Sequence, residues 1–177
     1  MTGEPPRVVF DCVIFTQALI NPKGPAGECV RAAESGDCIL HLSPFVLQEI
    51  RELPDKLPVR HGITAERVER LIQQIRKYAI LVTDVPERFT HPTDPKDSAY
   101  VNLALATNSE LVVSRDLHLL TLMDATTPDG RSFKQRFPEL GVLRPVEFLK
   151  ELEARKLPDI DAQPGHEPQQ DDSESEP

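Results

Sequence analysis

Five short runs of β-branched and other apolar residues alternate with longer segments of helical periodicity along most of this chain. The apolar runs cover residues 7–15, 38–42, 79–83, 111–114 and 141–143. Alternating strands and helices are typical of a parallel sheet with helices on both faces, because each parallel strand needs a crossover connection. The pattern therefore predicts an α/β fold, with three α/β/α layers and a central parallel sheet of about five strands.

The segments between these runs carry recognisable helix signals. Ser43 before Pro44, and Asp94 before Pro95, are favoured helix starts, since the first residue caps the helix and proline suits its first position. The predicted helices cover residues 26–35, 44–53, 64–78, 95–107, 117–123 and 145–155. Residues 126–138 are polar and are predicted to form a long loop.

Composition divides the chain into one folded domain, residues 1–157, and an acidic tail, residues 158–177. The tail contains Pro, Gln, Ser and acidic residues without apolar periodicity, so we expect it to be disordered. No apolar run approaches the roughly 20 residues of a membrane span. The first six residues lack the layout of a signal peptide. These features predict a soluble, cytoplasmic protein.

Several classes of function are disfavoured by composition. The three cysteines form no CxxC pair and the five histidines form no HExxH pair, which argues against structural zinc and zinc-hydrolase sites. The formal net charge is −9, which disfavours an extensive nucleic-acid interface, because phosphate contacts favour Lys and Arg. Any groove for nucleic acid is therefore expected to be only weakly basic.

Asp11 is the most informative single residue, because it interrupts the first apolar run. A buried ionised carboxylate is costly unless it is paired or binds a metal ion. The alternative is an aspartate that is satisfied by backbone donors at the end of a strand, or by a basic partner.

Three further acids are candidate metal ligands. Glu49 shares a helical stripe with Phe45 and Leu53, so we expect it on the apolar face; a salt bridge at the rim is the alternative. Asp97 lies in the first turn of its helix, where it can equally form a capping box with Asp94. Asp116 follows the fourth predicted strand, where it can also cap the next helix.

One divalent cation could bind all four acids, Asp11, Glu49, Asp97 and Asp116. In open parallel sheets, ligands bind beyond the carboxyl ends of the strands. Mg²⁺ and Mn²⁺ prefer carboxylate oxygens and water as ligands, and can activate water for attack on phosphate. Ser114, two residues before Asp116, is placed to support the site by hydrogen bonding to a metal-bound water.

From Arg7 to about Lys150 the chain resembles the PIN domain family, and within it the toxin components of prokaryotic toxin–antitoxin pairs. The resemblance is carried by four stretches in order: RVVFDCVIFTQALINPKGPAG, LSPFVLQEI, DPKDSAYVNLALA and LVVSRDLHLL. They contain Asp11, Glu49, Asp97 and Asp116 respectively. The closing VLRPVEFL resembles the last strand and helix of the family.

The resemblance implies a metal-dependent endoribonuclease that uses Mg²⁺ or Mn²⁺ and takes single-stranded or structured RNA as its substrate. It also implies inhibition by a cognate antitoxin protein and assembly into a homodimer. No membrane partner is expected.

Two positions depart from the family pattern. Val13 stands where members usually carry an asparagine that helps to hold the acids by hydrogen bonding. His118 stands where many members carry a further acid, and imidazole is a poorer ligand for Mg²⁺.

These departures keep two alternatives open. One is a degenerate PIN domain that binds RNA or a protein without cleaving. The other is a phosphotransferase with Asp11 as nucleophile, which is disfavoured because that chemistry usually needs a second acid at the position of Val13.

Overall fold

The computed structural model describes residues 4–156. Its strands are β1 (Arg7–Phe10), β2 (Ile39–Leu42), β3 (Ile80–Leu81), β4 (Leu111–Val113) and β5 (Gly141–Leu143). Its α-helices are α1 (Cys12–Ile20), α2 (Pro25–Glu34), α3 (Pro44–Arg51), α4 (Leu53–Lys56), α5 (Ala65–Ile75), α6 (Ser98–Thr107), α7 (Leu117–Thr121), α8 (Pro128–Arg136) and α9 (Pro145–Lys156). Two short 3₁₀ helices, η1 (Val59–His61) and η2 (Pro95–Asp97), complete the set of described helices.

The five strands form one parallel sheet in the order β3-β2-β1-β4-β5. This confirms the predicted α/β class and the strand number. β1 lies in the centre, and Val8, Val9 and Phe10 are fully buried, as expected for a parallel strand that is covered on both faces. The connections leave β1 toward β2 on one side and leave β4 toward β5 on the other. The strand order therefore reverses between β1 and β4.

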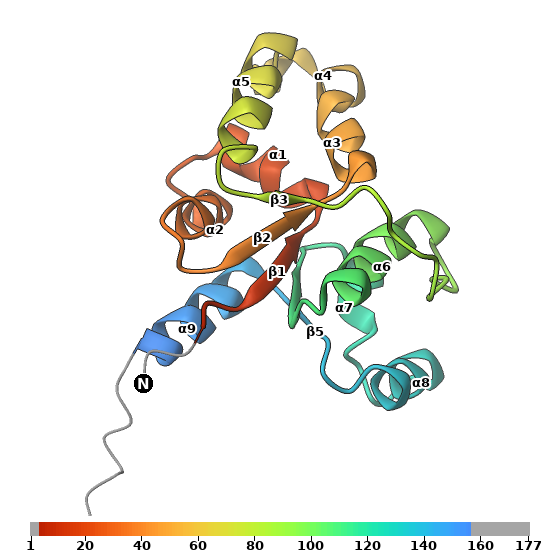
Figure 1. Cartoon of the computed structure of the whole chain (residues 1–177). Helices are drawn as coiled ribbons and strands as arrows, with labels where there is room; N and C mark the ends of the chain where they lie inside the picture. The colour runs from red at the N-terminus through yellow and green to blue at the C-terminus, as the bar shows by residue number, and fades with distance from the viewer. Residues whose placement is uncertain (1–3, 157–177) are drawn as a thin grey trace, which may run out of the picture.

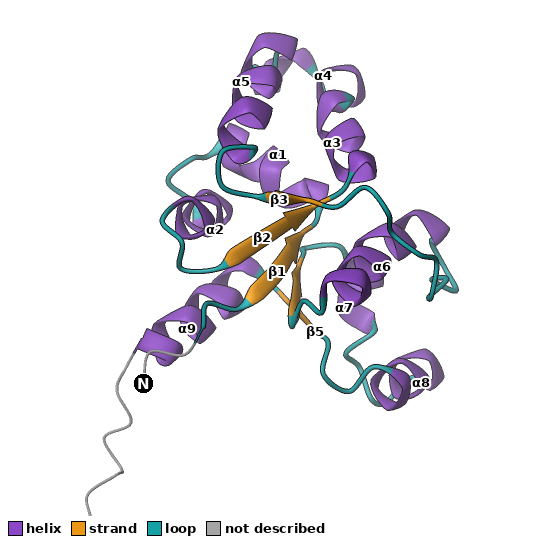
Figure 2. Ribbon diagram, in the orientation of Figure 1, coloured by secondary structure: helices purple, strands orange, loops and turns teal. Residues whose placement is uncertain are grey.

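Helices cover both faces of this sheet, as Figures 1 and 2 show. Phe10 contacts Phe15 of α1 and Phe148 of α9, with ring centroids 6.0 and 5.8 Å away, so α1 and α9 share a face. α2 packs against both α1 and α9. α6 packs against β1, β2 and β4, and lies with α7 on the other side of the sheet in Figure 2.

The apolar run predicted as one strand over residues 7–15 is divided, which corrects the sequence interpretation. The strand ends at Phe10, and helix α1 begins at Cys12. Asp11 caps that helix by accepting a hydrogen bond from the Val13 amide at 3.3 Å. Apolar periodicity did not reveal this change, because α1 is apolar on most of its circumference and so resembles a buried strand.

The loop predicted over residues 126–138 was also wrong, because most of it forms α8. Thr127 caps this helix by accepting from the Gly130 amide at 3.0 Å, and Pro128 occupies its first position. Phe133 of α8 is buried and joins this helix to the hydrophobic core. Within residues 4–156, no helix is long and apolar enough to cross a membrane. The acidic tail predicted from residue 158 onward lies outside the described residues.

Candidate metal centre at the carboxyl edge of the sheet

Two of the candidate ligands follow the carboxyl ends of neighbouring strands. Phe10 of β1 pairs with Val113 of β4, and Asp11 comes directly after Phe10. Ser114 comes directly after Val113, and Asp116 follows two residues later. This is the point at which the strand order reverses, where open α/β sheets form a ligand-binding crevice.

Asp11 is 6% exposed and is held at both carboxylate oxygens. Its Oδ2 accepts a hydrogen bond from the Ser114 hydroxyl at 2.5 Å, and its Oδ1 accepts from the Val13 amide. Burial raises the pKa of Asp11 above its ordinary value, and the negative charge of Asp116 adds to this, while the bonds from Ser114 and Val13 oppose it. Backbone capping and metal binding are thus compatible roles for this carboxylate.

Ser114 joins the two strand-end acids. Its hydroxyl oxygen accepts a hydrogen bond from the Asp116 amide at 2.9 Å while the hydroxyl donates to Asp11. Ser114 is fully buried. The Asp116 side chain caps α7 by accepting from the His118 amide at 2.8 Å, and it remains partly exposed. Ser114 therefore fixes the relative positions of the segments that carry Asp11 and Asp116.

Asp97 ends η2 and enters the same region from a third segment. The residue is 8% exposed, and its Oδ2 is buried with no hydrogen-bond partner among residues 4–156. Burial, followed by the negative charges of Asp116, Asp94 and Asp11, raises the pKa of Asp97 to about 7. A buried, repelled and unpartnered carboxylate is a strong sign of a position that is suited to a cation.

Glu49, on α3, is the candidate acid that is paired with a basic side chain. Its side chain is 25% exposed and accepts a hydrogen bond from Lys56 Nζ at 3.0 Å. Burial, followed by the negative charges of Asp11 and Glu49, raises the pKa of the Cys12 thiol to about 12. The salt bridge proposed as the alternative for Glu49 is therefore present in the described structure.

The expected burial of the whole Glu49 stripe needs correction. The buried face of α3 carries Val46, Leu47 and Ile50, while Phe45 is 37% exposed. Glu49 lies at the border of that face, because successive residues of a helix are rotated by about 100°.

Two residues that were not predicted as ligands complete the cluster. One donor atom each from Asp94, Asp97 and His118 lies within 4.8 Å of the others. The Nδ1 atom of His118 is 3.7 Å from Asp97 Oδ2 and 3.9 Å from Asp116 Oδ1. The spacing of Asp94 and Asp97, three residues apart across a helix start, was the sequence signal for the first of these, but it was interpreted only as capping.

Tyr100 and His91 support this edge from within the protein. The Tyr100 hydroxyl accepts a hydrogen bond from the Cys12 amide at 3.3 Å, which links α6 to the start of α1. His91 is buried, and its Nε2 is 3.0 Å from the carbonyl oxygen of His118. Its Nδ1 accepts hydrogen bonds from the Thr93 and Asp94 amides, both at 3.1 Å.

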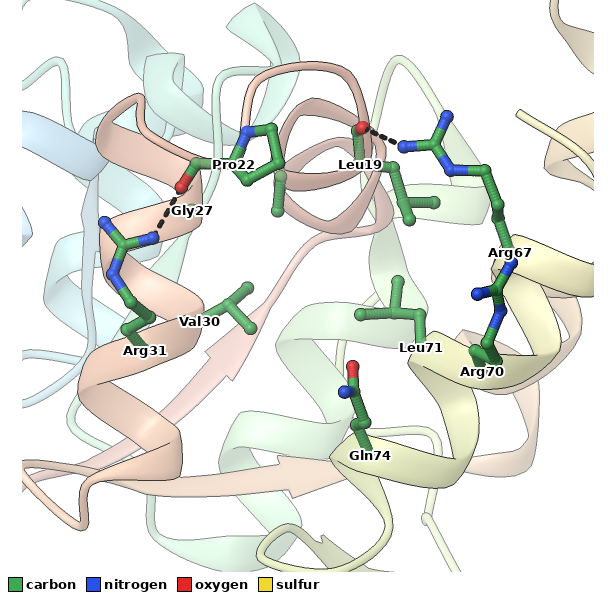
Figure 3. A pocket seen from close by; sticks show the side chains of 10 residues that line it. Leu19, Pro22, Gly27, Val30, Arg31, Arg67, Arg70, Leu71 and Gln74 are labelled. Carbon is green, nitrogen blue, oxygen red and sulfur yellow. Dashed lines mark hydrogen bonds between the residues drawn. The ribbon is translucent and has the colours of Figure 1, made fainter. Parts of the chain in front are cut away.

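A separate cleft of about 390 Å³ lies between α1, α2 and α5, and Figure 3 shows it from close by. Leu19, Val30 and Leu71 give it an apolar wall. Arg31 and Arg67 border it. Arg31 donates a hydrogen bond to the carbonyl oxygen of Pro22, and Arg67 donates one to the carbonyl oxygen of Leu19. Leu19 is eight residues after Asp11, the cap of α1, and the helical rise over that interval is about 12 Å, which separates the cleft from Asp11. Among the described residues its lining contains no acid, so this cleft offers no carboxylate to a metal ion.

Comparison with known proteins agrees with this geometry. The chain is 26% identical over 149 residues to the uncharacterized protein MJ1680 of Methanocaldococcus jannaschii, which covers 83% of this chain and 92% of that protein. A family model described as PIN domain matches residues 7–118, more than half of the chain and the whole span from Asp11 to Asp116. The protein therefore belongs to the PIN domain family.

Proposed function

We propose that this protein is a metal-dependent endoribonuclease that hydrolyses phosphodiester bonds of RNA, with Asp11, Glu49, Asp97 and Asp116 as the ligands of a divalent cation. The observation that carries the proposal is the convergence of Asp11, Asp97 and Asp116 from three separate segments, with one buried carboxylate oxygen of Asp97 lacking a hydrogen-bond partner among the described residues. Membership of a family whose members are generally nucleases supports it.

The residues present fit Mg²⁺ or Mn²⁺. The donors are carboxylate oxygens, which hard divalent cations prefer, and a cation would offset the repulsion that raises the pKa values of Asp11 and Asp97. When bound, such a cation lowers the pKa of water and stabilises negative charge on phosphate. Glu49 can join the site when its carboxylate exchanges Lys56 for the cation.

Other side chains of this protein would position the acids and attract the RNA. Ser114 holds the Asp11 carboxylate and the Asp116 amide in fixed positions, which limits the reorganisation needed during reaction. Lys96 and Arg115 are exposed and directly precede Asp97 and Asp116 in sequence. Their charges are placed to attract the RNA backbone to an otherwise negative edge.

Cleavage of a mixed-sequence single-stranded RNA tests the proposal. The purified protein is incubated with Mn²⁺ or Mg²⁺, and then with chelator, beside the variants Asp11→Asn and Asp129→Asn. Asp129 is an exposed acid in the first turn of α8 and serves as the matched control. We expect chelator to stop cleavage, Asp11→Asn to slow it by at least about 100-fold, and Asp129→Asn to leave it unchanged.

The result that would contradict the proposal is a well-folded protein, free of inhibitor, that cleaves no RNA with either metal ion. Circular dichroism and thermal melting of each variant separate loss of the site from loss of the fold. Cleavage that persists unchanged in Asp11→Asn would show contamination by another nuclease or a different site.

A second candidate is a PIN domain that binds RNA or a protein partner without cleaving. Val13 favours it, because this residue offers Asp11 only its backbone amide where the family usually provides an asparagine side chain as well. Mn²⁺ affinity distinguishes the two candidates: a degenerate domain should bind Mn²⁺ weakly or not at all. In that case Val13→Asn is the first substitution with which to restore the site.

A toxin role with a cognate antitoxin, and a homodimeric assembly, belong to the same proposal. Expression of the active protein alone should arrest growth, and Asp11→Asn should relieve the arrest. Light scattering of the purified protein reports its assembly.

A further inference from the structure

The cluster formed by Asp94, Asp97 and His118 contains a nitrogen donor among carboxylates. One ligand atom from each of the three residues lies within 4.8 Å of the other two. His118 Nδ1 is 3.7 Å from Asp97 Oδ2. Two ligands bound at about 2.1 Å to one ion lie at most about 4.2 Å apart, so this pair is already spaced to share a cation.

Asp97 gives an independent indication that a ligand belongs here. Its Oδ2 is buried, has no hydrogen-bond partner within residues 4–156, and faces the imidazole of His118. A carboxylate removed from water in this way is costly unless a cation or a donor satisfies it. The nearby charges of Asp116, Asp94 and Asp11 increase the cost and also favour a positive ion over a neutral molecule.

The backbone of His118 is fixed while its ring is left available. Its amide donates to Asp116, and its carbonyl oxygen accepts from the Thr121 hydroxyl at 2.8 Å. The same carbonyl oxygen is bonded to His91, whose other ring nitrogen accepts from the Asp94 amide. His91 thus ties the Asp94 loop to α7. Both of its own nitrogens are occupied, so of the two rings only that of His118 is available to a metal ion.

We propose that His118 is a metal ligand through Nδ1, together with Asp94 and Asp97, and that it makes this site prefer a first-row transition-metal ion such as Mn²⁺ over Mg²⁺. This inference rests on the proposed function and adds a nitrogen donor to its ligand set. Imidazole suits transition-metal ions, whereas Mg²⁺ strongly prefers oxygen ligands. The alternative is that protonated His118 only forms ion pairs with the carboxylates.

Pulsed electron paramagnetic resonance of Mn²⁺ bound to the full chain distinguishes these cases. Directly bound imidazole gives a nitrogen modulation of the electron spin echo, whereas an ion-paired imidazole does not bind the ion. We expect the modulation in the natural protein and its loss in His118→Asp. His61→Asp, the same change at a histidine outside the cluster, should retain it.

Calorimetric titration with Mn²⁺ and with Mg²⁺ measures the selectivity. We expect the ratio of Mn²⁺ to Mg²⁺ affinity to fall by about tenfold in His118→Asp, because an oxygen donor replaces nitrogen. His118→Ala should weaken Mn²⁺ binding, and thermal melting checks that each variant is folded.

The possible results distinguish failure of the His118 ligand role from failure of the proposed metal-dependent function. Mn²⁺ bound without nitrogen modulation, with an affinity ratio unchanged in His118→Asp, would overturn the role of His118 and leave the acidic site standing. A natural protein that binds neither metal ion would overturn both. The spectrum of the natural protein decides the ligand role even if a variant fails to fold.

Discussion

At the residue scale, Asp97 is a carboxylate whose ionised form is disfavoured both by burial and by neighbouring negative charges. One buried oxygen of its carboxylate has no hydrogen-bond partner within the described residues. Burial, followed by the charges of three other aspartates, raises its pKa. Asp11 is also shifted upward, but Ser114 and the Val13 amide partly compensate it. The two carboxylates therefore have different roles in the metal-free protein: one is held by hydrogen bonds and the other is available.

This difference predicts how stability depends on pH. The pKa of Asp97 is about 7 in the folded protein against an ordinary value of 3.8, so between these values the folded state binds more protons than the unfolded state. The free energy of unfolding should therefore fall as pH rises from about 4 to 7, by up to about 1.4 kcal/mol per pH unit from this group. Asp97→Asn should reduce the slope, as measured by urea unfolding of the metal-free protein.

Two further measurements sharpen that test. Asp129→Asn, at an exposed acid of α8, should retain the slope of the natural protein. Saturating Mn²⁺ should raise the stability most above pH 7, where Asp97 is ionised. A slope that is identical in the natural protein and in Asp97→Asn would show that the carboxylate is not strained by its surroundings.

At the element scale, two segments changed type between expectation and structure for physical reasons. Helix α1 follows β1 after a single residue, because Asp11 caps it from within an apolar run. Helix α8 is polar except for a small apolar contact, so its local sequence resembles a loop. Short helices of this kind are stabilised mainly by tertiary packing rather than by intrinsic propensity.

The packing of α8 gives a direct test. Phe133 lies with its ring centroid 5.2 Å from that of Phe89 and 5.3 Å from that of Phe137. Phe133→Ala should lower the free energy of unfolding by about 3–5 kcal/mol, because it leaves a cavity in this aromatic group. Phe45→Ala, at a phenylalanine that is 37% exposed, is the control and should cost clearly less. Denaturant unfolding measures both, and equal losses would contradict the packing argument.

At the scale of the whole molecule, the order of the strands brings the segments of the candidate site together. Because β1 and β4 are neighbours, Asp11 and Ser114 meet although they are 103 residues apart in sequence. Charge is also distributed unevenly. Residues 159–177 contain seven of the 29 acidic residues and neither Lys nor Arg, which leaves 22 acidic and 20 basic residues in the rest of the chain. The net charge of −9 therefore overstates the repulsion between the folded domain and RNA.

Truncation after Pro158 tests this distribution of charge. We expect the melting temperature to change little, because the composition of the removed segment cannot bury much apolar area. Binding of single-stranded RNA at low salt should become tighter, since seven negative charges are lost. A large drop in melting temperature would mean that the removed segment docks on the domain. Thermal melting and fluorescence anisotropy measure the two effects.

The sequence by itself determined the class of the fold and pointed to two residues of the candidate site. Strand and helix periodicity are local properties, so they predicted the parallel sheet without knowledge of any contact. Asp11 was found because it interrupts an apolar run, and Asp116 because it follows an apolar strand, where parallel sheets bind their ligands. The four motifs in order then identified the PIN domain family, which the match of the family model to residues 7–118 confirms.

Only the tertiary structure decided which atoms meet at that edge. The fold brings Asp94 and His118, which are 24 residues apart in sequence, close to Asp97. It also pairs Lys56 with Glu49 in a salt bridge. These distances depend on how η2, α4 and α7 are oriented against the sheet, which no local pattern encodes. The raised pKa of Asp97 likewise arises from burial and from charges on other segments. Long-range packing therefore converted a set of acidic residues into a candidate metal centre.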